Sequence, residues 1–402
     1  MIRSAMQLHP ERKLLATHVE SWLDRLDSDT DLNVDLGRWR SSGMHADAYM
    51  QGLLSLVLRQ GGRVDVRIPS TSFAPGRLEA ALRTPDVRDG PDRLTSSERL
   101  LGGTLGGLIV GHLGTLDRPE IPLAQRAELD RREHIFGFGP ERAIARLVDP
   151  GGTRRPNPAN APKRMNNLRR RLRQLADAFG VAQMKPMFGT STQPTRTWEW
   201  MFQFAFEALE NTNDHGAFDL QGETLRMVRF VQLRRIPVLH SQGLGPLTRS
   251  AEAATAHYLK RLAASERSHR PSWSLIEVTV GDGGLGIPAW IAHGVDIYER
   301  PHQEEMKRLR EALLPDATTK SLWESGRGLG FTKMLQAAHH LDGLVMVRTG
   351  RCAISRTYLD ADGQPQRVDF DDGGSDAYVV DEAGELPLTA GTVVTLLYPY
   401  FG

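Results

Sequence analysis

The stretch 198–213 constrains the fold of this chain more than any other, because its spacing predicts an amphipathic helix. Residues three and four apart share a helix face. The apolar positions of one face are Phe202, Ala205 and Leu209. The other face presents Glu207, Asn211 and Asp214, which are two carboxylates around a carboxamide. The apolar face suits packing on a sheet, whereas the polar row fits either a solvated surface or a site.

A second segment joins a strand to a glycine-rich turn. The apolar run 273–280 predicts a buried strand, and Asp282, Gly284 and Gly286 follow it. Glycines allow the backbone to approach a flat ring closely. An aspartate at the end of a strand can accept a hydrogen bond from an exocyclic amine. Alone the pattern is weak evidence, because glycine-rich turns after strands are common.

A third segment alternates glycines immediately before an amphipathic helix. Its glycines are Gly326, Gly328 and Gly330. The start of a helix offers free backbone N–H groups and a positive dipole end to an anion. The segment therefore predicts a phosphate site, with an ordinary glycine-rich loop as the alternative.

In order, spacing and residue type, the three segments resemble the GHKL ATPase superfamily, which includes gyrase B, the ninety-kilodalton heat-shock chaperone, sensor histidine kinases and mismatch-repair ATPases. The first segment matches the family pattern Glu-x-x-x-Asn-x-x-Asp. The resemblance covers residues 190–402. It implies the α+β class, with a C-terminal Bergerat-fold α/β sandwich that has a mixed sheet and helices on one face. A smaller mixed α/β domain precedes it.

The resemblance also implies ATP and Mg²⁺ as cofactors and gives a role to each matching residue. Glu207 would be the catalytic base that activates water, and Asn211 would ligate Mg²⁺. Asp282 would accept the adenine amine, and Asp214 would support the adenine pocket. The further nucleotide-binding positions that it implies are Gly284, Gly286, Gly326, Arg327, Gly328, Leu329, Gly330 and Thr395.

By the same resemblance, residues 288–325 would form a mobile lid over the nucleotide. The titratable residues of this lid include His293, His302 and Lys320. Arg327 and Lys333 are candidates for contact with the γ-phosphate, with ordinary surface placement as the alternative. His215, beside Asp214, fits a packing role better than that of a phospho-acceptor.

Three functions stay open at this point. The first is an ATP hydrolase that acts as a conformational switch toward the N-terminal domain, a protein partner or a homodimer. Such an enzyme would work in a larger bacterial assembly, such as a stress or phage-defence system. The second is a serine or histidine kinase acting on a separate partner, and the third is a non-catalytic ATP-gated binding module. Residues 163–179 contain no histidine, which argues against autophosphorylation there.

The rest of the chain predicts a domain order with less detail. Residues 1–150 are expected to form the small mixed domain of unknown role, and residues 118–148 look helical. Residues 151–185 are expected to be a Pro/Gly-rich linker and a basic helix, and residues 186–402 the ATP-binding domain. The basic stretch 163–173 would suit nucleic acid, but a solvated helix is favoured because no aromatic residues interleave the arginines.

The composition limits the kinds of partner, metal site and cellular location that the chain is expected to have. The formal net charge of +1 gives the whole molecule no general attraction to nucleic acid. The one cysteine, Cys352, excludes an intrachain disulfide and a cysteine-based zinc cluster. No apolar run approaches the ~20 residues needed to span a bilayer, and the first residues do not resemble a signal peptide. A cytoplasmic location is therefore expected.

Overall fold

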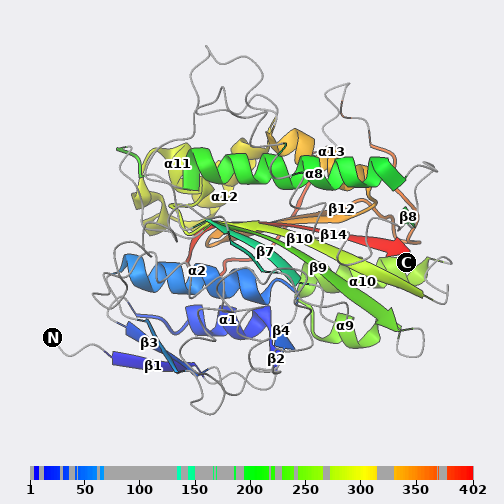
Figure 1. The fold of residues 1–402 in the computed structure, drawn as a ribbon. Coiled ribbons are helices and arrows are strands. Elements are labelled where there is room, and N and C mark those ends of the chain that lie inside the picture. The colour runs from blue at the N-terminus through cyan, green and yellow to red at the C-terminus, as the bar shows by residue number, and fades with distance from the viewer. Residues whose placement is uncertain are drawn as a thin grey trace.

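The computed structural model is α+β, with one large sheet between helices on both of its faces (Figure 1). The structure describes residues 4–8, 13–27, 30–35, 41–42, 44–60, 64–67, 134–136, 144–149, 166, 169, 185–186, 194–216, 219–221, 229–239, 243–265, 272–314, 330–368, 370 and 378–401.

The large sheet contains nine strands among the described residues. In chain order they are β6 (His134–Phe136), β7 (Ile144–Asp149), β8 (Lys185–Pro186), β9 (Arg229–Leu239), β10 (Ser272–Gly281), β11 (Leu344–Gly350), β12 (Cys352–Thr357), β13 (Asp381–Glu382) and β14 (Thr389–Phe401). Their spatial order is β13-β12-β11-β14-β10-β9-β7-β6, and β8 also pairs with β14. Every described pair in this sheet is antiparallel, so the mixed sheet expected from the sequence is wrong.

Strand β10 lies in the middle of this sheet and is buried on both faces. Successive strand residues point to opposite faces, so Ile276 and Val278 pack into the core on one side, whereas Trp273 and Leu275 pack into the core on the other. Apolar residues that point to both faces are typical of a strand covered twice. The prediction of helices on one face is therefore incomplete, because helices cover the second face of the sheet as well.

The first face of the sheet carries the predicted helix. This face is covered by α8 (Pro194–Asn211), α12 (His302–Leu313) and α13 (Gly330–His340). Helix α8 lies along α13 (Figure 1), and its Phe204, Ala205 and Ala208 are buried against the sheet. A π-helical turn, Thr212–Gly216, ends α8. The apolar side of α8 is therefore confirmed as a sheet-packing surface.

We expect Phe204→Ala to lower the free energy of unfolding by about 3–5 kcal/mol, because it removes a fully buried ring and leaves a cavity. Leu314→Ala is the matched control, since Leu314 is 53% exposed, and it should change stability by less than about 0.5 kcal/mol. Denaturant unfolding of both variants measures the difference. Equal losses would contradict the packing of α8 on the sheet.

The second face of the sheet carries helices from both halves of the chain. An N-terminal unit has three parallel strands, β1 (Ser4–Leu8), β3 (Thr30–Asp35) and β5 (Val64–Arg67), with the short parallel pair β2 (Lys13–Leu14) and β4 (Ser41–Ser42) beside it. Its helices are α1 (Ala16–Leu23) and α2 (Ala46–Arg59). Two further helices on this face are α9 (Gly245–Arg249) and α10 (Ala253–Ala264). Helix α2 lies between the small sheet and the large one (Figure 1).

Helix α2 comes very close to the start of β14. A Cβ atom on Gly52 would overlap the side chain of Thr389 and come within 3.4 Å of the carbonyl oxygen of Ala390. Only glycine allows so close an approach without movement of the strand. The N-terminal unit thus touches the large sheet directly at the first residues of β14.

Buried polar contacts join the N-terminal unit to the second face. The backbone N–H of His45 donates to Glu277 at 3.2 Å, and the Tyr49 hydroxyl donates to Glu252 at 2.9 Å. Burial raises the pKa of the Glu252 carboxyl. The guanidinium of Arg348, in β11, donates to Glu20 of α1 at 2.8 Å. Buried polar groups are costly unless they are paired, so these contacts specify one docked arrangement.

The large sheet contains residues on both sides of position 150, where the sequence predicts a domain boundary. Strand β7 pairs with β9 in an antiparallel register, so residues 144–149 belong to the large sheet. Residues 134–136 pair with β7, so the described parts of the stretch 118–148, which looks helical in sequence, are strands. At the start of the chain, the expected mixed α/β unit is present within residues 4–67.

The described part of the expected basic helix makes intramolecular contacts. Arg169 donates to Glu199 at 2.5 Å, and its guanidinium lies 5.7 Å from the centre of the Phe202 ring.

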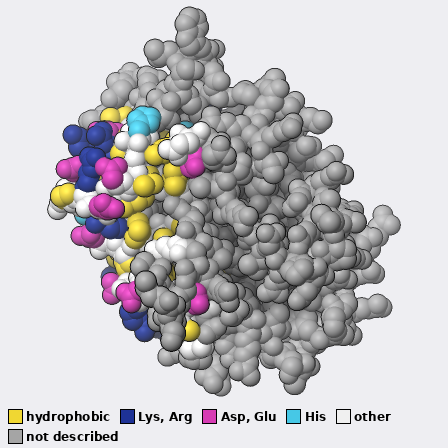
Figure 2. Space-filling view, turned by 90° about the vertical axis from the view of Figure 1, so that its left-hand side faces the viewer, with side chains coloured by type: hydrophobic (Ala, Val, Ile, Leu, Met, Phe, Trp, Pro, Cys, Tyr) yellow, Lys and Arg dark blue, Asp and Glu magenta, His cyan; other side chains and the backbone are white. Residues whose placement is uncertain are grey.

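On the face shown in Figure 2, basic and acidic side chains are mixed over the described surface. No helix in the described ranges has the length and apolar character to cross a membrane.

Candidate functional site

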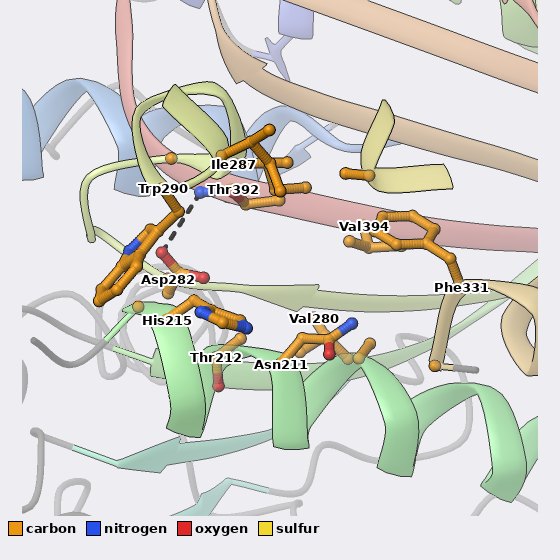
Figure 3. Close-up of a pocket in the computed structure, with 16 residues that line it drawn as sticks. Asn211, Thr212, His215, Val280, Asp282, Ile287, Trp290, Phe331, Thr392 and Val394 are labelled. Carbon is orange, nitrogen blue, oxygen red and sulfur yellow. Dashed lines mark hydrogen bonds between the residues drawn. The ribbon is translucent and has the colours of Figure 1, made fainter. Parts of the chain in front are cut away.

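A pocket lies where the end of α8, the end of β10 and the start of α13 meet (Figure 3). Its volume is about 110 Å³, several times the ~10–15 Å³ that one water molecule requires. It is lined by Ala208, Asn211, Thr212, His215, Gly216, Val280, Asp282, Gly286, Ile287, Trp290, Ile291, Ala312, Gly330, Phe331, Thr392 and Val394. The pocket therefore has room for a small organic ligand, and its walls combine apolar side chains with a few polar groups.

Helix α8 and the turn after it supply the polar side of the pocket. Asn211, Thr212 and His215 lie on this helix and turn, across the pocket from Ile287 and Thr392 (Figure 3). The Thr212 hydroxyl donates to the carbonyl oxygen of Leu209 at 2.8 Å, which holds the last turn of the helix. A π-helical turn is a frequent feature of functional sites. Asp214 lies in this turn, and its side chain is outside the described residues.

Asp282 is held at the end of β10 by two backbone donors. Its Oδ1 atom accepts hydrogen bonds from the N–H of Gly284 at 2.9 Å and from the N–H of Thr392 at 3.3 Å (Figure 3). Asp282 as a whole is only 5% exposed. A Cβ on Gly284 would overlap the backbone of Gly216, so this glycine lets the two turns pack together and does not line the pocket.

Gly286 lines the pocket in a conformation that favours glycine. Its φ is +91°, and a Cβ there would lie 2.5 Å from the Tyr298 hydroxyl. The next residue, Ile287, begins α11 (Ile287–Ala292) and donates its N–H to the Thr349 hydroxyl at 3.0 Å. This helix carries Trp290, whose ring packs edge-on against the His215 ring at 5.2 Å between centroids. These contacts build one apolar wall beside Asp282.

Gly330 brings the start of α13 against the polar side of α8. A Cβ on Gly330 would lie 3.4 Å from Oδ1 of Asn211 and 3.6 Å from Oε2 of Glu207. Glu207 does not itself line the pocket, but it stands one helical turn before Asn211 at this edge. The structure therefore brings a carboxylate, a carboxamide and a helix N-terminus together, which is an arrangement that can bind a cation and an anion side by side.

Four residues of the predicted phosphate turn, Gly326, Arg327, Gly328 and Leu329, lie outside the described residues, and so does Lys320. Thr395 is described, and it does not line the pocket. Its hydroxyl lies 3.2 Å from that of Thr279 on the second face of the sheet, whereas its neighbour Val394 lines the pocket. The reason is strand parity, because adjacent residues of β14 point to opposite faces.

Much of the predicted lid is packed into the molecule. Residues 287–313 form α11, a 3₁₀ turn at Val295–Glu299 and α12. Met306, Leu309 and Leu313 of α12 are buried in the core that α8 and α13 share. His302 begins α12, and His293 ends α11 with a left-handed φ of +53°. The remainder of the expected lid, residues 315–325, lies outside the described part of the chain.

Several pocket residues were not expected from the sequence, namely Thr212, Ile287, Trp290, Phe331 and Thr392. Apolar residues beside a glycine-rich turn show the same sequence pattern whether they line a ligand pocket or pack in a core. The position of Thr392 directly after Gly391 was a usable signal, since this pair stands near the start of the last strand in the region that the resemblance covers.

The described residues contain no cluster of three His, Cys, Asp or Glu side chains able to hold a metal. Asn211 is compatible with a metal that keeps most of its ligands from water and a bound phosphate, as Mg²⁺ does. Comparisons with protein-family models, with curated proteins and with solved structures find no match to this chain.

Proposed function

We propose that this chain binds and hydrolyses ATP with Mg²⁺, using a Bergerat-type site of the GHKL kind as a conformational switch. One observation carries the proposal: Asn211, Asp282 and Gly330, from three separate sequence segments, line a single pocket. Glu207 stands beside the same pocket, at its Gly330 edge.

The Asp282 end of the pocket suits adenine. Its carboxylate is oriented by two backbone N–H donors, and Trp290, Ile287 and Val280 surround it with apolar surface. An acceptor in an apolar slot favours a base that presents an amine there. A guanine base would present a carbonyl instead, which would leave two acceptors facing each other.

The Gly330 end suits the phosphates. Helix α13 spans eleven residues from Gly330, and the positive end of its dipole favours an anion. Asn211 would offer its carboxamide oxygen to Mg²⁺, which supplies positive charge between phosphate oxygens. Glu207 would then accept the proton of the attacking water, as a general base must be within hydrogen-bond reach of it.

The contact between α2 and β14 supports the switch. Gly52 of α2 lies against Thr389 and Ala390, and Thr392 of the pocket wall follows in the same strand. Two sites are coupled when both bias one packed element. A nucleotide that shifts β14 would therefore change how α2, and with it the N-terminal unit, packs on the large sheet.

Titration of the full chain with ATP, in buffer with Mg²⁺, tests binding, and release of inorganic phosphate tests hydrolysis. Saturable ATP binding and steady turnover are the expected results. Binding without turnover would instead favour the ATP-gated module. Transfer of labelled γ-phosphate to an added partner protein, with little free phosphate, would favour the kinase.

We expect Asn211→Ala to lower the gain in ATP affinity that Mg²⁺ brings by roughly tenfold, or about 1.4 kcal/mol, because a ligand oxygen is lost. Binding is measured with Mg²⁺ and with EDTA. Gln303→Ala is the control, since it removes an exposed carboxamide from α12. An equal affinity loss for Asn211→Ala with Mg²⁺ and with EDTA would rule out the metal role.

A further inference from the structure

Lys333 forms an ion pair with the proposed base. Its Nζ atom donates to Oε1 of Glu207 at 2.9 Å. The two residues come from different helices, since Lys333 lies on the first turn of α13 and Glu207 lies near the end of α8. The contact therefore spans the junction where Gly330 meets Asn211.

A second donor reaches the same oxygen. Gln203, one turn earlier on α8, donates its Nε2–H to Oε1 of Glu207 at 2.6 Å. Two donors on one oxygen fix the rotation of the carboxylate, which is otherwise a soft torsion. The other oxygen, Oε2, then faces the Gly330 edge of the pocket, 3.6 Å from the place of a Cβ on that glycine.

This pair is less exposed than an ordinary surface ion pair. The Glu207 side chain is 14% exposed and that of Lys333 is 38% exposed, whereas Asp296 and Arg300 are 58% and 47% exposed. Exposed pairs contribute little to stability. The Lys333–Glu207 pair instead lies at the edge of the pocket, where the direction of Oε2 of Glu207 decides whether this oxygen can reach a bound water.

We propose that Lys333 is a positioning residue for hydrolysis, acting with Gln203 to aim Oε2 of Glu207 at the attacking water. The inference rests on the proposed function. In the step, the water oxygen bonds to the γ-phosphorus and Oε2 takes the proton of the water. The bond from this phosphorus to the bridging oxygen breaks, and its electron pair leaves with ADP. Lys333 keeps its own proton throughout.

The role predicts a fall in kcat with unchanged binding. We expect Lys333→Met to lower kcat by about 100-fold, the scale of a small misplacement of a catalytic group, while KM for ATP and the Kd values for ATP and ADP stay constant. Lys333→Arg should restore much of the rate, because it returns a cationic donor. Lys307→Met, an exposed lysine of α12, is the matched control.

A double variant separates positioning from a structural role. In Glu207→Gln, the further change Lys333→Met should have no added effect on kcat, because residues that act as a unit are not additive. Additive losses would overturn the inference. So would a wild-type kcat in Lys333→Met, or a loss of ATP affinity relative to ADP, which would make Lys333 a phosphate ligand. If the wild-type chain neither binds nor hydrolyses ATP, the proposed function itself fails.

Discussion

Glu207→Gln is expected to lower the rate of ATP hydrolysis by about 10²- to 10⁴-fold, the usual contribution of a general base, and to leave ATP affinity within about threefold. Glutamine keeps the shape of the side chain but does not take up the proton of the attacking water. The reacting edge of the site, at Asn211 and Gly330, is otherwise unchanged. Phosphate release and ATP titration of the same preparation measure the two quantities.

The matched control for this change is Glu199→Gln. Glu199 lies on the same helix, its side chain is 55% exposed, and it pairs with Arg169 away from the pocket. This variant should hydrolyse ATP at the wild-type rate, because exposed pairs contribute little. Wild-type turnover in Glu207→Gln would show that another group activates the water.

Asp282→Asn is expected to exchange the base preference of the pocket. The wild-type chain should bind ATP more tightly than inosine triphosphate, whose base has a carbonyl in place of the amine. In the variant, the carboxamide N–H₂ can donate to that carbonyl, so the preference should vanish or reverse. A hydrogen bond to a charged group contributes about 1.5–3 kcal/mol, which corresponds to roughly 10- to 150-fold in ATP affinity.

The comparison of two nucleotides guards against a trivial explanation. Asp282 also holds the turn at Gly284 and Thr392, so a misfolded variant would lose affinity for both nucleotides equally. That result would remove Asp282 from the base-reading role. Asp296→Asn, which alters an aspartate with 58% of its side chain exposed, should leave both affinities unchanged.

The meeting of Asn211, Asp282 and Gly330 in one pocket was predictable because each signal is local. Helical spacing sets the side of α8 on which Asn211 lies, and a strand end sets the position of Asp282. A glycine before an amphipathic helix marks the start of α13. None of these inferences requires knowledge of distant pairing.

The errors arose where pairing between strands that are distant in sequence decides the structure. The register of β14 is set by β10 and β11, and it puts Val394 rather than Thr395 toward the pocket. Strand β7 looks helical by pattern, but its pairing with β9 makes it part of the sheet. The covering of the second face was not predicted, because the resemblance implied helices on one face of the sheet only.

The packing of α2 on β14 has a consequence for the order in which the molecule is made. Helix α2 leaves the ribosome early, and the strand against which it packs is translated much later. Until then, the surface of α2 that faces β14 lacks its partner, and transiently exposed apolar surface favours aggregation. Strand β14 also carries Thr392 of the pocket. Its synthesis therefore completes both the pocket and the surface on which α2 packs. A nascent chain therefore acquires the pocket only when it can also dock its earliest helices.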